Sequence, residues 1–297
     1  MNTVFQRLFA PVAALLALGS AAESRAPEPA RPALWEVSDA DTKIYLFGTI
    51  HVLPDDLQWR TAAFDNAVTN SQQLVVETIV DQQNLQSVRQ AQFELGFGKS
   101  LPPIAQRVPA AKLPLLRSAI AKTGAPEKAF DQMDTWLAAI TLLGVQLGEL
   151  GLKGSHGPEE ILRQQFLAAQ KPIGELETNV EQFGYFDRLP EKAQRDLLEG
   201  SIEPLPVARK ELAKMLGPWR RGDVKGIGDS FNQDFKGSPA LREALLVQRN
   251  ANWARWIEQR MAQPGTVMVA VGAGHLAGRG SVLELLAKGG YKVRRLQ

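Results

Sequence analysis

The stretch Val267-Met268-Val269-Ala270-Val271, followed by Gly272-Ala273-Gly274-His275, is the most informative part of this sequence for the fold. A short, entirely apolar run rich in β-branched residues predicts a buried strand. Glycine then lets the chain turn sharply where the strand leaves the sheet, so that the following histidine lies near the carboxyl end of the strand. In open α/β sheets, ligands bind at this edge.

A second segment near the start of the chain has the same pattern. The strand formers Ile44-Tyr45-Leu46-Phe47 lead into Gly48-Thr49-Ile50-His51, so here too a strand is followed by glycine, two further residues and histidine. If the two strands are neighbours in the sheet, both imidazoles reach one site. The alternative is that each histidine only caps a loop.

Further strands are expected over residues 73–79, 171–177 and 291–296. Apolar residues at helical spacing between Leu57 and Val68 separate the first strand from the strand at 73–79. Such a strand-helix-strand unit implies a parallel pair with a crossover helix.

Most of the remaining chain is predicted to be helical. Between about residues 101 and 235, apolar residues recur at helical spacing with a single strand-like interruption. Ser238-Pro239 predicts the start of a long helix that reaches about Met261, and a last helix is expected over about residues 281–287. The sequence therefore predicts an α/β fold with a central mixed, largely parallel sheet, built from the N- and C-terminal segments, and a large helical insert.

The composition excludes several classes of chemistry. The chain has 297 residues, of which 44% are hydrophobic and 22% charged, as in a globular protein. Its net charge of +2 gives no general attraction to nucleic acid or to an anionic membrane, so no nucleic-acid partner is expected. The absence of cysteine excludes disulfides, thiolate zinc sites, iron–sulfur clusters and a cysteine nucleophile.

Residues 1–22 have the pattern of a signal peptide, with one positive charge at Arg7, an apolar stretch and small residues before the expected cleavage point. The apolar stretch, residues 8–18, is shorter than the roughly 20 residues that span a bilayer. We therefore expect an exported protein, periplasmic or extracellular, that keeps no transmembrane segment after signal cleavage. Tethering to the membrane by an uncleaved signal is the alternative. Residues 23–32 are interpreted as a Pro/Ala-rich linker, and residues 33–297 as one domain.

Histidines and glutamates at strand ends are the candidate site residues. The chain has only three histidines, and His156 lies in a glycine-rich turn that we interpret as surface. Glu77 follows the apolar part of a strand, where a carboxylate is costly unless it is paired or bound to something. His51, Glu77 and His275 together match the ligand set of a catalytic divalent-metal site. A salt bridge at the mouth of the sheet is the alternative for Glu77. Glu177 closes a later strand and is expected to be a general base or a further ligand.

The long helix contributes two further candidates. Arg249 and Asn250 lie within an otherwise apolar face of this helix, where polar groups need partners. The guanidinium of Arg249 could fix a carboxylate ligand or stabilise an oxyanion. An internal ion pair is the alternative.

Several segments occur in a characteristic order along the chain. They are Leu34-Trp35-Glu36-Val37, Leu46-Phe47-Gly48-Thr49-Ile50-His51-Val52-Leu53-Pro54, Val75-Val76-Glu77, Lys171-Pro172-Ile173-Gly174-Glu175-Leu176-Glu177-Thr178, Glu181-Gln182, Arg249-Asn250 and Val271-Gly272-Ala273-Gly274-His275-Leu276-Ala277-Gly278. This ordered set covers nearly all of the expected domain, and it resembles the TraB/GumN family, which includes the Tiki branch of animal proteases.

The resemblance implies an α/β fold similar to that of the erythromycin-esterase and ChaN-like proteins. It also implies an active site made of the two glycine-to-histidine motifs and the glutamates, to which His51, Glu77, Glu177 and His275 correspond. In the Tiki branch such a site looks like that of a divalent-metal-dependent protease. Many bacterial members have glycine, an apolar residue and aspartate before the central helix. This chain has Gly157-Pro158-Glu159 instead, so the acid is kept only as the longer glutamate.

Our first hypothesis is an exported metal-dependent hydrolase of the TraB/GumN type, a peptidase that acts on a peptide or protein. His51, Glu77 and His275 would hold a divalent cation, for which manganese, cobalt and zinc all suit imidazole and carboxylate ligands. Water activated by the cation would be the nucleophile.

Four further residues have expected roles in this hypothesis. Glu177 would act as a base or an additional ligand, and Arg249 would stabilise charge that develops on the substrate. Asn250 and Glu159 are expected to contact the substrate. The alternative hypothesis is a non-enzymatic periplasmic protein on the same fold. It would bind haem through two axial imidazoles, as the ChaN-like relatives suggest, or take part in exopolysaccharide production, as the GumN name suggests.

Overall fold

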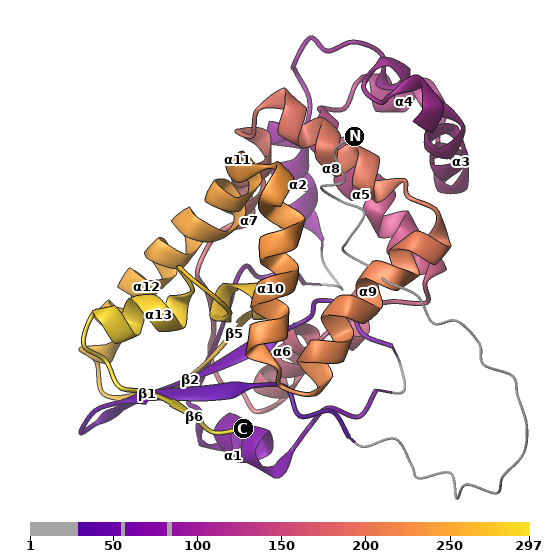
Figure 1. The fold of residues 1–297 in the computed structure, drawn as a ribbon. Helices are drawn as coiled ribbons and strands as arrows, with labels where there is room; N and C mark the ends of the chain where they lie inside the picture. Colours follow the sequence, from indigo (N-terminus) through magenta and orange to yellow (C-terminus); the bar gives the residue numbers. More distant parts are fainter. Residues whose placement is uncertain (1–28, 55–56, 82–84) are drawn as a thin grey trace, which may run out of the picture.

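The computed structural model describes residues 29–54, 57–81 and 85–297. The predicted signal peptide, residues 1–22, and most of the predicted linker lie outside the described residues. The described part contains a six-stranded sheet with helices packed around it (Figure 1). The strands are β1 (Leu34–Ser38), β2 (Thr42–Thr49), β3 (Gln73–Val76), β4 (Ile173–Glu175), β5 (Gly265–Gly272) and β6 (Val293–Arg295).

The sheet is mixed and largely parallel, which confirms the predicted fold class. Its strand order is β4-β3-β5-β2-β1-β6, in which β5 is parallel to both β2 and β3, and β4 is parallel to β3. β1 is antiparallel to β2, and β6 is antiparallel to β1. The two strands that precede the histidine motifs are therefore neighbours, and their pairing runs as far as Thr49 opposite Gly272.

Two details of the sheet differ from the prediction. β2 and β3 run in the same direction, but β5 lies between them, because the most apolar strand is best buried at the centre of the sheet. β1 is not among the predicted strands, since it carries the charged Glu36. That carboxylate is balanced across the antiparallel edge by Arg294 at 2.9 Å and Lys43 at 3.4 Å.

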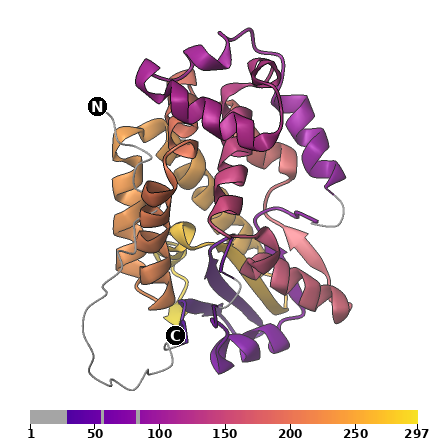
Figure 2. The same ribbon diagram turned by 90° about the vertical axis from the view of Figure 1, so that its right-hand side faces the viewer.

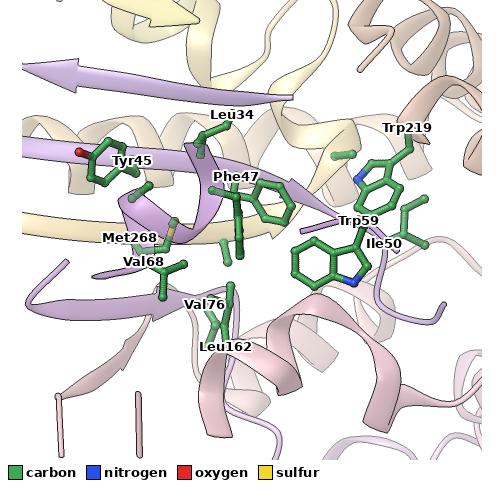
Figure 3. Packing of buried hydrophobic residues seen from close by; sticks show 14 of the residues in the cluster. Leu34, Tyr45, Phe47, Ile50, Trp59, Val68, Val76, Leu162, Trp219 and Met268 are labelled. Atoms are coloured by element: carbon green, nitrogen blue, oxygen red, sulfur yellow. The ribbon is translucent and has the colours of Figure 1, made fainter. Parts of the chain in front are cut away.

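Alternating side chains along the strands divide the core into two layers. Phe47 and Met268 face one layer, which α1 (Ala62–Asn70), α6 (Pro158–Ala168), α9 (Leu205–Arg220) and α10 (Val224–Asp234) cover. Figure 3 shows this layer, with the rings of Phe47, Trp59 and Trp219 gathered beside the sheet. The opposite face packs against α13 (Val282–Lys288) and α12 (Gln248–Met261), which lie side by side in Figure 1.

The predicted helical insert has a core of its own. Its cluster includes Ile104, Leu116, Phe130, Leu142, Leu198 and Leu241. In Figures 1 and 2 this region lies at the opposite end of the molecule from β1 and β6. The helices between β3 and α9 not yet given are α2 (Gln86–Leu95), α3 (Leu113–Thr123), α4 (Glu127–Asp131), α5 (Thr135–Glu149), α7 (Asn179–Asp187) and α8 (Glu191–Ser201). Short 3₁₀ turns are η1 (Ile104–Gln106), η2 (Ala110–Lys112), η3 (Gly154–His156), η4 (Phe235–Gly237) and η6 (Ala273–Leu276).

The predicted long helix is present and contains an irregular turn. It begins at α11 (Pro239–Arg242), passes through the π-helical turn η5 (Glu243–Val247) and continues as α12 to Met261. The π turn, which apolar spacing did not predict, lies immediately before Arg249 and Asn250. Among the described residues, no helix has both the length and the apolar character needed to cross a membrane.

Candidate active site

The carboxyl ends of the parallel strands form one edge of the sheet, and the predicted site residues start from it. Thr49 ends β2 directly beside Gly272 at the end of β5, so the two histidine motifs leave the sheet together. Glu77 follows β3, and its backbone carbonyl accepts a hydrogen bond from the Glu177 backbone N–H at 2.9 Å. The topology therefore places both motifs and both glutamates at a common edge.

Three of these side chains converge over Gly272. A Cβ atom added to this glycine would lie 3.1 Å from Glu77 Oε1, 3.6 Å from His275 Cδ2 and 3.7 Å from His51 Nε2. The Gly272 backbone N–H donates to Glu77 Oε1 at 2.7 Å, and His275 Nε2 lies 3.8 Å from the same oxygen. The absence of a side chain at Gly272 thus leaves a small space that is surrounded by two imidazole edges and a carboxylate.

Arg249 is buried next to this space and binds both glutamates. Its Nε donates to the two carboxylate oxygens of Glu177 at 3.0 Å, and its Nη2 donates to Glu77 Oε2 at 2.7 Å. The guanidinium also stacks on Trp253, at 4.7 Å from the ring centroid. The buried ion pair that was the alternative for Glu77 and for Arg249 is therefore present.

His275 is buried and held in one orientation by the residue after Arg249. Its Nδ1 lies 2.6 Å from Asn250 Oδ1, and Asn250 Nδ2 donates to the Gly280 carbonyl at 2.7 Å. Because an amide oxygen can only accept, this network assigns the proton to Nδ1 of His275 and leaves a lone pair on Nε2. Nη1 of Arg249 lies 3.3 Å from His275 Nε2, on which this lone pair lies.

His51 is held from a different helix and is open to solvent. Its Nδ1 lies 2.7 Å from Glu159 Oε1, an oxygen that also accepts the hydroxyl of Thr49. The side chain of His51 is 65% exposed, whereas that of His275 is 8% exposed. A Cβ at Gly157 would lie 2.1 Å from the His51 carbonyl oxygen, so this close approach of α6 to the motif requires glycine.

The charges around the space move the two histidine pKa values in opposite directions. The carboxylate of Glu159 raises the pKa of His51 to about 9, although water screens part of this attraction at the exposed ring. Burial, together with the nearby guanidinium of Arg249, lowers the pKa of His275 to about 3. Burial alone would raise the pKa of Glu77, but the combined attraction of Arg249, His275 and His51, with the Gly272 N–H hydrogen bond, outweighs it and holds that pKa below its usual range.

A cavity of about 260 Å³ opens beside His51 and Glu77. Val52, Val76 and Val80 form part of its wall, and Gly154 with polar and charged side chains, among them Glu160 and Arg163, forms the rest. Among these, Arg163 is held by Glu160 at 2.7 Å and by Asp81 at 3.0 Å. The cavity is small for a ligand site, and its mixed lining suits an apolar group that carries polar atoms.

The predicted site residues divide into two sets in the structure. His51, Glu77 and Glu159 line the cavity. His275, Glu177, Arg249 and Asn250 are buried, and they contact the first set through Arg249 or support the ring of His275. Asn250, which was expected to contact the substrate, is buried and binds His275 and the Gly280 carbonyl.

Three further residues belong to the site and were not singled out by sequence reasoning. Trp253 Nε1 donates to Glu177 Oε1 at 2.9 Å, and Gln182 Nε2 donates to Glu77 Oε2 at 3.4 Å. Thr49, which binds Glu159, lies inside the first histidine motif. Trp253 follows Asn250 by one helical turn, so its spacing was a usable signal.

Fold and site together define an α/β protein with a buried polar centre of histidine, glutamate and arginine at the carboxyl edge of its sheet. The chain belongs to the TraB/PrgY/gumN family, whose model matches residues 33–295. It is 25% identical over 255 residues to the uncharacterized protein YbaP of Escherichia coli (strain K12), covering 86% of this chain and 92% of that protein. The YbaP protein of Shigella flexneri is also 25% identical, over 242 residues, with 82% and 87% covered. No solved structure matches the chain.

Proposed function

We propose that this protein is an exported, divalent-metal-dependent hydrolase that cleaves peptide bonds. The observation that carries the proposal is the convergence of His51 Nε2, Glu77 Oε1 and the Cδ2 edge of the His275 ring on the space where Gly272 lacks a Cβ, beside a cavity. Imidazole nitrogens with a carboxylate oxygen form the donor set of catalytic sites for zinc, manganese or cobalt.

The donor types suit a cation in this space. Glu159 and Asn250 bind Nδ1 of His51 and of His275, and Nδ1 partners of this kind typically support metal-bound histidines. Nε2 of the neutral His275 is an acceptor, and Nε2 of His51 would become one when a cation displaces its proton. The separation of 3.8 Å between His275 Nε2 and Glu77 Oε1 is close to that of two ligands that each lie about 2 Å from one ion. Glu77 and Glu177 bind the guanidinium of Arg249, and Glu159 binds His51. Three carboxylates thus outnumber the positive groups at the site, so the local charge also favours a cation.

The buried residues support the proposed ligands. The Gly272 N–H holds Glu77 Oε1 beside the space over Gly272, and Arg249, itself held by Glu177, balances the charge of Glu77 at Oε2. Asn250 and Glu159 orient the two rings. A divalent cation bound there would polarise a carbonyl oxygen and lower the pKa of water in the site. The valine wall of the cavity would take an apolar part of the substrate and exclude water from it.

The direct test is metal analysis of the purified protein together with cleavage of a peptide library. We expect the metal-stripped protein to regain one equivalent of Mn²⁺, Co²⁺ or Zn²⁺, and metal-stimulated cleavage that excess chelator abolishes. A variant with both His51→Ala and His275→Ala should bind no metal, whereas the control His156→Ala should bind as the wild type does. Equal metal content in the double variant, or full cleavage in excess chelator, would contradict the proposal.

Export is a separate part of the proposal and rests on residues 1–22 alone. Expression of the full chain in a bacterial host, followed by fractionation and N-terminal sequencing, tests it. We expect the protein in the periplasmic or secreted fraction, with a new N-terminus near residue 23. The uncleaved full chain in the cytoplasm would contradict export without affecting the metal site.

The geometry does not favour the haem-binding alternative. Axial ligation needs an open face at each histidine nitrogen. His275 Nε2 is buried and faces Arg249, and the cavity beside His51 is only about 260 Å³.

A further inference from the structure

The guanidinium of Arg249 holds its partners with unequal strength. Nη2 lies 2.7 Å from Glu77 Oε2, and Nε lies 3.0 Å from both oxygens of Glu177. Nη1 is the loosely bound nitrogen, at 3.3 Å from His275 Nε2 and 3.4 Å from the Leu245 carbonyl. Since N–H donors to oxygen or nitrogen are optimal near 2.9 Å, Nη1 makes the weakest contacts of the group.

Nη1 nevertheless lies next to a nitrogen that a metal site would need. The lone pair on His275 Nε2 is the one that a cation over Gly272 would need, and Nη1 is directed at it. Within the described part of the chain, no group of three or more His, Asp or Glu side chains could hold a metal ion as the side chains stand. A cation there would therefore require His51, Glu77 and His275 to close in around it, and the guanidinium of Arg249 to release His275 Nε2.

We propose that Nη1 of Arg249 and a divalent cation are alternative partners of His275 Nε2, so that Arg249 acts as an internal competitor for the metal. This inference rests on the proposed function. The guanidinium is a rigid plane, so it shifts as a whole away from His275 when the cation binds. Glu177, Glu77 and the Leu245 carbonyl remain its hydrogen-bond partners after this shift. Leu245 lies in the π turn η5, a type of turn that is frequent at functional sites.

Arg249 supplies a positive charge to the two glutamates in the metal-free protein. Glu77 and Glu177 are both buried, and buried carboxylates without a partner are strongly destabilising. Arg249 supplies that partner before any metal arrives, so the protein can fold in the metal-free form. The same contact should make metal binding weaker than the bare set of His51, Glu77 and His275 would allow.

The double variant Arg249→Met with Glu177→Gln tests the competition. It removes one positive and one negative charge, so the net charge of the site is unchanged, and the amide oxygen of the introduced glutamine can still accept the indole N–H of Trp253. Titration calorimetry with Mn²⁺ and with Co²⁺ should show binding about tenfold tighter than in the wild type, the value of one hydrogen bond to a charged group. Saturating metal should also raise the melting temperature of the variant more than that of the wild type.

Arg107→Met is the matched control. Arg107 is a buried arginine in the helical insert whose guanidinium binds the carbonyls of Pro102, Asp131 and Met133. Its replacement destabilises the fold without touching the site, so metal affinity should stay at the wild-type value. If the double variant does not fold, Arg249→Lys serves instead. Lysine keeps the charge and lacks Nη1, and it should also bind metal more tightly than the wild type.

The possible outcomes separate this inference from the proposed function. Metal binding by the variant alone, or tighter binding by the variant, supports the competition. Equal or weaker binding by the variant, with normal binding by the wild type, overturns the competition and leaves the metal-dependent hydrolase intact. No binding by either protein overturns both.

Discussion

The two histidine segments, residues 48–51 and 272–275, share a sequence pattern and leave neighbouring strands, yet their surroundings are opposite. His51 is 65% exposed and bound to the carboxylate of Glu159, whereas His275 is 8% exposed and bound to the amide of Asn250. The pKa of the first is raised to about 9, and that of the second is lowered to about 3. A shared pattern thus fixes where each histidine lies, while partners from α6 and α12 decide its chemistry.

Substitution of the glycine that begins each segment should give the largest difference in metal affinity between the two segments. Gly272→Ala would place a methyl group among the three proposed donors, and the backbone at φ −51° and ψ 135° accepts alanine without strain. We expect metal affinity to fall by more than the roughly 10- to 100-fold that loss of a supporting hydrogen bond costs. Titration with Mn²⁺ measures this directly.

Gly48→Ala is the counterpart in the other segment. Its Cβ would lie 3.1 Å from Ala273 Cα and away from the donors, so overpacking should cost about 1–3 kcal/mol of unfolding free energy while metal affinity is kept. Gly144→Ala, in an open position on α5, controls for the substitution itself. Strong metal binding by the Gly272→Ala protein would refute the placement of the cation.

The next difference concerns stability of the metal-free protein. His275→Ala removes a buried ring that packs against Trp253, with ring centroids 4.2 Å apart and planes tilted by 45°, and leaves Asn250 Oδ1 without its donor. We therefore expect a loss of about 3 kcal/mol in the free energy of unfolding. His51→Ala removes a largely exposed ring and should cost less than about 1 kcal/mol. Urea denaturation of the two variants checks the ranking, and equal losses would show that the two environments do not differ in the way described.

The fold was largely predictable because its main signals are local. An apolar run that ends in glycine marks a strand and its exit, and two such runs with their helices define an α/β sheet. The central position of β5 was harder to predict from the sequence, since strand order depends on how all faces of the sheet are buried together. β1 was missed because Glu36 is tolerated through its pairing with Lys43 and with Arg294, the latter a residue 258 positions away.

The candidate site was predictable in its members but not in their contacts. Strand ends identified His51, Glu77, Glu177 and His275 because the carboxyl edge of a parallel sheet gathers whatever follows each strand. The pairing of His51 with Glu159 spans 108 positions and depends on how α6 approaches the motif at Gly157. Likewise, the sequence left open whether Arg249 stabilises an oxyanion or forms an ion pair. Side-chain geometry decides this, and residue spacing carries no information about it.

Substitution of the residue that binds Nδ1 of each histidine should lower metal affinity by smaller factors. Asn250→Ala removes the acceptor that fixes the proton of His275, and water cannot readily replace it in a site where Asn250 itself is buried. We expect metal affinity to fall by about 10- to 100-fold. Calorimetric titration beside the wild type tests this. An unchanged affinity would mean that His275 does not contribute to the metal site.

The smallest effect is expected for Glu159→Gln. The amide oxygen of glutamine can still accept from Nδ1 of His51 and from Thr49, so the ring keeps its orientation and only the charge is lost. Because His51 is exposed, water screens that charge, and metal affinity should fall by less than about tenfold. If metal affinity fell further in Glu159→Gln than in Asn250→Ala, the exposed histidine would depend more on its partner than the buried one does. The carboxylate of Glu159 would then itself be a ligand or a base. Measurement of peptide cleavage at saturating metal then distinguishes these two roles, since a lost ligand is compensated by excess cation and a lost base is not.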